Sequence, residues 1–307
     1  MVHDFSAVNR ILDRIQGLPQ FRSRYESIGA VTTAADFERI PLMTKEDFRA
    51  ALGELRSGSE QQTEPRYLFS SGGTLGSPQL SLIPGHMFLD DILVHWHPLD
   101  RTDILCNMFL PGKLWSSHYF YNALGQRLAR ETIALGPVNE VEMDGWLRFL
   151  QEQGVTAIAA TPTTLRHVLR FCHRNGFALP SVRKLLWVGE PFDDRELKQL
   201  VNELLPQAQT WGLYGSTETW VIGYNSPDCP HDTFHILPYQ FVELIEGNEI
   251  AVTCLHPDAC NILLRYRIGD SGEWSSCPCG HPGAALRVLG RKGGSLSSAG
   301  PFSIRSG

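Results

Sequence analysis

The chain has 307 residues, 42% of them hydrophobic and 20% charged, which is enough for one large domain or two smaller ones with a sizeable core. A formal net charge of -6 without a basic run argues against nucleic acid as the main partner, and no apolar run is long enough to span a membrane. Seven cysteines and an N-terminus unlike a signal peptide lead us to expect a cytoplasmic protein with reduced thiols.

Two helices are expected in the N-terminal part of the chain. Apolar residues at helical spacing predict one amphipathic helix over residues 5–28. Pro41 then breaks the chain, and Thr44 followed three residues later by Asp47 predicts a capping box that opens a helix reaching Leu52. A structural role is sufficient to explain this region.

The Ser/Gly-rich segment Ser70–Pro78, called the Ser/Gly segment below, is expected to be the tip of a hairpin. An apolar run ending at Phe69 predicts one strand and Leu80–Pro84 the second. Between them, glycines allow several backbone N–H groups to point inward and hydroxyls add donors, which suits a phosphate. A linker of ordinary function is the alternative, and a Walker loop is excluded by the missing Gly-Lys-Ser/Thr. The candidate phosphate-binding residues are Ser70, Ser71, Gly72, Gly73, Thr74 and Gly76.

Strands and helices alternate in the middle of the chain. Strands are expected at 104–110, 131–135, 157–160 and 184–188, with helices at 119–130, at 145–153 and from Thr161 onward. This alternation predicts an α/β fold with a largely parallel sheet. Ligands of such folds bind at the carboxyl ends of strands, where the Gly189–Pro191 and Tyr214–Glu218 turns are expected.

The pattern changes at residue 240. A hairpin over 241–253 with a Gly-Asn turn is followed by expected strands at 262–267 and 285–289. We therefore predict an α/β core over residues 1–240, a smaller β subdomain over 241–290, and a hinge with a flexible tail over 291–307.

Two polar turns have side chains suited to a nucleotide. In the first, the Tyr214–Glu218 turn, an aromatic ring beside glycine can stack on a purine. Thr217 can donate to a phosphate oxygen, and the Glu218 carboxylate suits Mg²⁺. In the second, Asp270 follows a glycine at a strand end and can accept both hydroxyls of a ribose. Ordinary surface turns are the alternative for both.

Four stretches follow one another in a distinctive order. They are Ser70–Pro78, Tyr214–Glu218, Tyr266–Asp270 and Gly290–Lys292. Over nearly the whole chain this order resembles the adenylate-forming superfamily of acyl-CoA synthetases, adenylation domains and luciferase. Ile40–Asp47 and Cys277–Gly280 are most similar to its phenylacetate-CoA ligase branch. The resemblance implies the large N-terminal domain of such an enzyme, with mixed and parallel sheets, helices and a smaller β subdomain.

The resemblance also implies a reaction. ATP and a carboxylic acid give an acyl-adenylate and pyrophosphate, and the acyl group then passes to CoA or to a carrier-protein thiol. The segment from Ser70 to Gly76 is implied to hold the β,γ-phosphates, Thr217 the α-phosphate, and Glu218 the Mg²⁺. The remaining nucleotide-binding residues implied are Gly189, Glu190, Tyr214 and Gly215 around the adenine, and Asp270 and Arg291 at the ribose.

The sequence departs from the family in two places. Ser77 and Gln79 stand where the family's glycine loop carries a lysine. In addition, the resemblance implies a lysine from a mobile C-terminal lid domain, whereas this sequence ends at Gly307. A longer chain supplies the lid, a separate protein supplies it, or the protein works without it; we do not expect this chain alone to complete the catalytic cycle. The alternative is a degenerate relative that binds a nucleotide, an acyl group or a partner protein without turnover.

A Cys/His set forms a candidate zinc site. A tetrahedral site needs four soft or borderline ligands, and Cys229, His235, Cys277 and Cys279 resemble the zinc-binding pattern of part of this branch. We expect a structural role for such an ion, and free buried thiols are the alternative. Other candidate ligands are His231, Cys254, Cys260 and His281. A zinc-stabilised nucleic-acid module is disfavoured by the net charge.

The acid itself is not specified by any motif. Trp115, His118 and Tyr119 follow Pro111-Gly112, where this family places residues of the acyl pocket. The aromatic content of residues 115–121 favours an aryl or small apolar acid.

Overall fold

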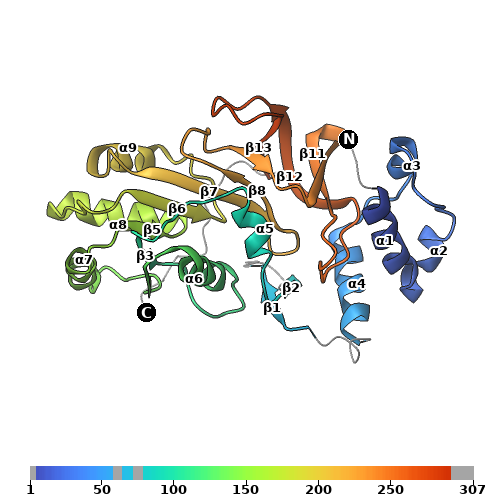
Figure 1. Ribbon diagram of the computed structural model, residues 1–307, viewed down its shortest axis with the longest axis horizontal. Helices are drawn as coiled ribbons and strands as arrows, with labels where there is room; N and C mark the ends of the chain where they lie inside the picture. Colours follow the sequence, from blue (N-terminus) through green and yellow to red (C-terminus); the bar gives the residue numbers. More distant parts are fainter. Residues whose placement is uncertain (1–4, 58–63, 72–78, 292–307) are drawn as a thin grey trace.

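The computed structural model describes residues 5–57, 64–71 and 79–291. One eleven-stranded sheet forms the centre of this part of the chain, with strand order β10-β11-β12-β13-β9-β8-β7-β6-β5-β3-β4 (Figure 1). A separate hairpin pairs β1 (Arg66–Ser70) with β2 (Leu80–Pro84). The expected mixed α/β fold is therefore confirmed.

The sheet has a parallel half and an antiparallel half. The parallel strands are β3 (Ile104–Asn107), β4 (Glu131–Ala134), β5 (Ala157–Ala159), β6 (Lys184–Val188) and β7 (Gln209–Ser216). The antiparallel strands are β8 (Trp220–Asn225), β9 (Thr233–Ile236), β10 (Gln240–Ile245), β11 (Glu249–Cys254), β12 (Tyr266–Ser275) and β13 (Ala285–Arg291). Because β13 pairs with β9, the two halves form one continuous sheet. The predicted boundary between an α/β core and a β subdomain at residue 240 stays a prediction.

Helices cover both faces of the parallel half. Leu105 and Leu186 belong to a core shared with α6 (Ser117–Leu128), whereas their neighbours Cys106 and Leu185 belong to a core shared with other helices. Those helices are α7 (Met143–Glu152), α8 (Pro162–Asn175) and α9 (Arg195–Leu204). Successive side chains of a strand point to opposite faces, so the continuous apolar runs of these strands fill both cores.

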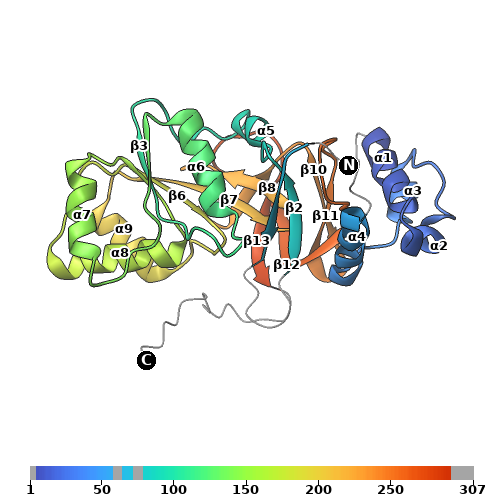
Figure 2. The same ribbon diagram turned by 90° about the horizontal axis from the view of Figure 1, so that it is seen from below.

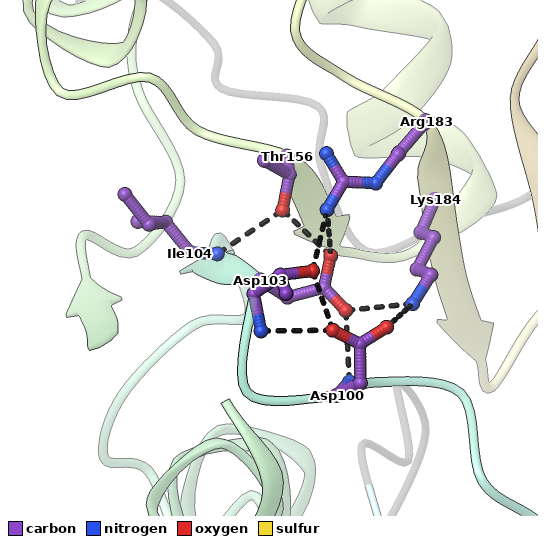
Figure 3. Close-up of polar contacts among 7 residues, drawn as sticks. Asp100, Asp103, Ile104, Thr156, Arg183 and Lys184 are labelled. Carbon is purple, nitrogen blue, oxygen red and sulfur yellow. Dashed lines mark hydrogen bonds and ion pairs between the residues drawn. The ribbon is translucent and has the colours of Figure 1, made fainter. Parts of the chain in front are cut away.

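A buried polar cluster fixes the amino ends of three parallel strands (Figure 3). The Asp103 carboxylate, fully buried before β3, accepts hydrogen bonds from the Thr156 hydroxyl at 2.8 Å and from Lys184 Nζ at 2.6 Å. Arg183 adds a third donor at 3.1 Å. Each donor stands at or just before the start of β5 or β6, so the cluster holds the edge of the sheet opposite the carboxyl ends.

The N-terminal region differs from the prediction. The single helix expected over residues 5–28 is wrong, because α1 (Phe5–Gln16) ends before Gly17 and a 3₁₀ turn, η1 (Pro19–Phe21), separates it from α2 (Arg22–Tyr25). Proline has no N–H to continue the helix, and glycine lowers helix propensity.

The capping box before the next long helix is confirmed. The Thr44 N–H donates to Asp47 at 2.8 Å, and the Asp47 N–H donates to the Thr44 hydroxyl at 3.2 Å. The helix α4 (Lys45–Ser57) runs further than predicted. Two shorter helices, α3 (Ala34–Glu38) and α5 (Leu89–Leu93), complete the helical elements that bear on the site.

The strand expected at 262–267 is wrong for most of its length, since β12 begins only at Tyr266. Arg265 adopts φ +51°, which interrupts the extended backbone. Its guanidinium pairs with Glu243 and donates to the backbone oxygens of Glu38 and Ile40, which holds this residue in place. Within the described ranges, no helix has both the length and the apolar character needed to cross a membrane.

Candidate active site

The predicted hairpin around the Ser/Gly segment is confirmed. Ser70 pairs with Leu80 at the end of the β1–β2 ladder, and the Ser71 N–H donates to the Gln79 carbonyl at 2.9 Å. The strands therefore bring the two ends of the segment together. Four of the predicted phosphate-binding residues lie outside the described residues: Gly72, Gly73, Thr74 and Gly76.

Asn261 connects this hairpin to the turn that follows β7. Its amide nitrogen donates to the Ser81 hydroxyl at 2.8 Å and to the Glu218 carbonyl at 3.0 Å, while its amide oxygen accepts from the Leu82 N–H. Asn261 is buried, so these bonds are shielded from water. One side chain thus fixes the distance between the hairpin and the Glu218 turn.

The turn between β7 and β8 is tightly built. A Cβ on Gly215 would lie 2.0 Å from the Trp220 carbonyl oxygen, so only glycine fits there. Ser216 and Thr219 hydrogen-bond each other through backbone and hydroxyl groups. Thr217, which lies between them in the chain, is half-buried.

Glu218 places a buried carboxylate beside β12. The residue is 7% exposed, and one carboxylate oxygen accepts from the Tyr266 hydroxyl at 3.4 Å. This is the only hydrogen bond of the Glu218 carboxylate within the described ranges. Burial and the nearby Glu218 raise the pKa of Tyr266 well above its ordinary value, so its proton stays on the phenol. The second oxygen of Glu218 is therefore available to a cation, and magnesium prefers such ligands.

Tyr214, Asp270 and Arg291 form a second polar group. The Tyr214 hydroxyl donates to one Asp270 oxygen at 2.9 Å, and Arg291 Nε pairs with the other at 3.1 Å. Burial raises the pKa of Asp270, although Arg291 and Tyr214 oppose this shift. The three residues come from β7, β12 and β13, so the fold brings together three stretches that are distant in sequence.

The Gly189-Glu190 turn lies at the carboxyl end of β6, as predicted. Gly189 has φ +91°, a conformation that favours glycine. The Glu190 carboxylate accepts from the Thr163 N–H at 2.9 Å, in the first turn of α8. Glu190 therefore has a helix-capping contact, and its predicted role at an adenine ring stays a prediction.

Aromatic rings extend from the hairpin to the Glu218 turn. Phe69 stacks between Tyr67, with ring centroids 5.2 Å apart, and Trp220, at 5.9 Å. Tyr119 of α6 packs on Phe69 at 5.7 Å and is 39% exposed. His118, in contrast, is buried and bonds the Phe109 carbonyl at 2.8 Å. Of the predicted acyl-pocket residues, Tyr119 packs on this aromatic cluster, in which Phe69 and Trp220 are buried, whereas His118 has a structural contact.

The four predicted metal ligands converge at a separate place. Ligand atoms of the predicted set all lie within 4.8 Å of one another, and His235 Nε2 lies 3.1 Å from Cys279 Sγ. The predicted set is Cys229, His235, Cys277 and Cys279. In the described part of the chain, the other candidate ligands do not join this cluster.

Burial and neighbouring groups shift the pKa values within the cluster. Burial raises the pKa of Cys277 to about 12. Burial also acts to raise the pKa of Cys279, but the His281 N–H and the neighbouring thiols outweigh it and lower that pKa. Burial and His281 lower the pKa of His235, which keeps the imidazole neutral, the form that binds zinc. His281 therefore lies in the surroundings of the cluster.

Two residues of the site were not predicted from the sequence. Asn261 and Tyr266 connect to Glu218 through contacts between segments more than forty residues apart. Tyr266 lies within one of the four motifs, and this position could have marked it as a candidate site residue. Asn261 lies immediately before the strand predicted over 262–267, and no local pattern marked it.

The described sheet has the fold of the N-terminal domain of adenylate-forming enzymes. The model of the family described as "AMP-binding enzyme" matches residues 27–238, and the chain belongs to this family. The motif resemblance to the adenylate-forming superfamily is therefore confirmed.

Individual relatives agree with this assignment. Indoleacetate–lysine synthetase of Pseudomonas savastanoi is 26% identical over 121 residues, which span 39% of this chain and 30% of that protein. The open form of 2-hydroxyisobutyryl-CoA ligase, solved with 2-HIB-AMP and CoA, superposes with a TM-score of 0.75 at 15% identity, covering 94% of this chain and 74% of that one. VinN with L-aspartate gives 0.56 at 18% identity, covering 84% and 70%. The structural matches show the fold.

Proposed function

We propose that this chain activates a carboxylic acid with ATP, forming an acyl-adenylate and pyrophosphate, and that the acyl group then passes to CoA or a carrier-protein thiol. The supporting observation is the connection of three motifs. Asn261 joins the Ser/Gly hairpin to the Glu218 turn, and Tyr266 of β12 reaches the same Glu218. A single nucleotide can then contact all of them.

Each group has a role that its chemistry allows. Asp270 accepts the ribose hydroxyls, with Arg291 and Tyr214 fixing the carboxylate. The hydroxyl of half-buried Thr217 donates to the α-phosphate. Attack of a carboxylate on phosphorus brings two anions together, so positioning and charge neutralisation account for the rate enhancement.

Magnesium fits the Glu218 position. Its buried carboxylate keeps one oxygen without a hydrogen bond among the described residues. When bound, Mg²⁺ supplies positive charge to the phosphate oxygens. The chain's own residues hold the nucleotide around it: Tyr266 orients Glu218 through its hydroxyl.

The aromatic cluster, with Tyr67 and Tyr119 as its exposed rings, supports an aryl or small apolar acid. Tyr67, Phe69, Tyr119 and Trp220 form contiguous rings next to the Glu218 turn, and flat rings bind flat apolar groups well. The Ile40–Asp47 and Cys277–Gly280 motifs support the phenylacetate-CoA ligase branch. The Cys/His cluster supports one structural zinc ion, and a lid domain or partner protein completes the cycle.

Acid-dependent exchange of labelled pyrophosphate into ATP tests this function. We expect exchange with at least one aryl or small apolar acid, supplied with a lid domain if needed, and its loss in Glu218→Gln. Nucleotide binding without exchange for any acid, with and without the lid, would favour the non-catalytic relative. The missing lysine of the Ser/Gly segment is the observation that keeps this second candidate open.

A further inference from the structure

Helix α4 presents two cations toward the proposed nucleotide site. Lys45 and Arg49 are four residues apart and therefore lie on one side of the helix. This helix packs against both β2 and β12 (Figure 2). The Lys45 ammonium lies 4.0 Å from the position of a Cβ built on Gly269, next to Asp270. The helix thus spans from the ribose side of the site to the Ser/Gly hairpin.

Arg49 contacts the end of the Ser/Gly segment. Its guanidinium donates to Gln79 Oε1 at 3.2 Å, and the Gln79 carbonyl accepts from the Ser71 N–H at 2.9 Å. Arg49 therefore lies beside Gln79, which pairs with Ser71 at the base of the Ser/Gly segment. Neither Lys45 nor Arg49 forms an ion pair with any carboxylate among the residues that the structure describes.

The NH₂ group of the Gln79 side chain has no hydrogen-bond acceptor among the described residues. A guanidinium only donates, so the amide oxygen must face Arg49 and the NH₂ group must point elsewhere. Gln79 is 7% exposed, and its Nε2 has no hydrogen-bond partner in the described part of the chain. Buried donors are rarely left unpaired, so this position calls for an acceptor. A phosphate oxygen accepts hydrogen bonds and carries the negative charge that Arg49 attracts.

We propose that Arg49 and Gln79 bind the β,γ-phosphates of ATP and that Arg49 supplies the positive charge that the Ser/Gly segment lacks. This inference rests on the proposed function, because it places the nucleotide at that site. Ser77 and Gln79 stand where related loops carry lysine. An arginine from α4, held against the Gln79 amide, delivers an equivalent charge from a neighbouring element.

Calorimetric titration with Mg-ATP, pyrophosphate and AMP tests the assignment. Arg49 is exposed, so Arg49→Met should fold normally, as circular dichroism will show. We expect this variant to bind ATP and pyrophosphate about 10- to 100-fold more weakly, with AMP affinity changed by less than about 3-fold. Arg148→Met on α7 is the matched control, since Arg148 forms an ion pair with Asp144 on the same helix and lies over the Phe177 ring, neither of which belongs to the proposed site.

A rescue variant sharpens the test. Arg49→Met combined with Gln79→Lys places a cation at the position where related loops carry one, and we expect it to regain most of the affinity for ATP. Unchanged ATP and pyrophosphate affinity in Arg49→Met, or an equal loss for AMP, would overturn the inference while leaving the proposed function intact. A wild-type chain that binds neither ATP nor AMP would instead overturn the proposed function.

Discussion

The Tyr214 hydroxyl donates a 2.9 Å hydrogen bond to Asp270, joining the end of β7 to β12 across the antiparallel part of the sheet. The same carboxylate pairs with Arg291 of β13. Residues from three motifs thus share one partly buried carboxylate, and we propose that this carboxylate binds the ribose of a nucleotide. The following experiments examine each part of this site.

Asp270→Asn should weaken the binding of both ATP and AMP by about 10-fold or more, because a charged acceptor for two ribose hydroxyls is replaced by a neutral amide. Tyr214→Phe keeps the ring and removes one bond to the carboxylate, so a loss smaller than about 3-fold is expected. Calorimetry with AMP measures both. Equal affinity of Asp270→Asn and the wild-type chain would remove Asp270 from the ribose site.

Glu218→Gln should weaken Mg-ATP binding by about 10-fold and leave ATP binding in the presence of a chelator unchanged, because only the metal ligand is lost. The amide still accepts from Tyr266, so the melting temperature should stay close to that of the wild type. Glu273→Gln, a surface partner of Arg287, serves as the control. A magnesium-independent loss of affinity would show that Glu218 acts on the nucleotide directly.

The Cys/His cluster should hold about one equivalent of zinc in the purified protein, measured by elemental analysis. Cys279→Ser should abolish this zinc and lower the free energy of unfolding by about 2 kcal/mol or more, since a structural zinc contributes folding energy directly. Cys260→Ser removes a thiol outside the cluster and should retain the metal. Metal-free wild-type protein with undiminished stability would refute the zinc site.

Asp47→Ala should lower the free energy of unfolding by about 1–2 kcal/mol at pH 7, because Asp47 completes the capping box of α4 and pairs with Arg24 at 2.7 Å. Burial acts to raise the pKa of Asp47, but hydrogen bonds from Thr44 and Arg24 outweigh it and lower the folded-state pKa below 3.8. The ionised group therefore stabilises the fold above about pH 4.

The sign of this pH dependence is testable by urea denaturation. As pH falls through the lowered pKa, the wild-type chain loses the contribution of Asp47, so its stability should approach that of Asp47→Ala. Arg24→Met separates the ion pair from the cap and should cost less than Asp47→Ala. A stability difference that stays constant from pH 7 to pH 2.5 would contradict the role given to the carboxylate.

Much of the fold follows from local pattern. The Thr44–Asp47 capping box and the strand Lys184–Val188 were predicted with their observed starting points, because capping chemistry and apolar runs are local signals. The long N-terminal helix was mispredicted, since its apolar spacing continues past Gly17 and Pro19 although the backbone does not. The left-handed Arg265 could not be predicted, because distant Glu243 holds it.

The residues of the candidate site could be predicted where they lie in sequence motifs. They could not be predicted where only contacts between distant segments bring them to the site. Asp270 and Glu218 stand in recognisable turns, and the structure brings their neighbours together. Asn261 and Arg49 act through contacts with residues far away in sequence, and asparagine or arginine at such positions is locally unremarkable. Only the three-dimensional fold could show that they face the same region.

A crystal structure of the chain with AMP tests the central claim most directly, because the claim is that separate turns surround one nucleotide. We predict that the ribose hydroxyls contact the Asp270 carboxylate, with the phosphate next to Thr217 and the adenine beside Tyr214. AMP bound in another crevice, with Asp270 still occupied only by Tyr214 and Arg291, would contradict it.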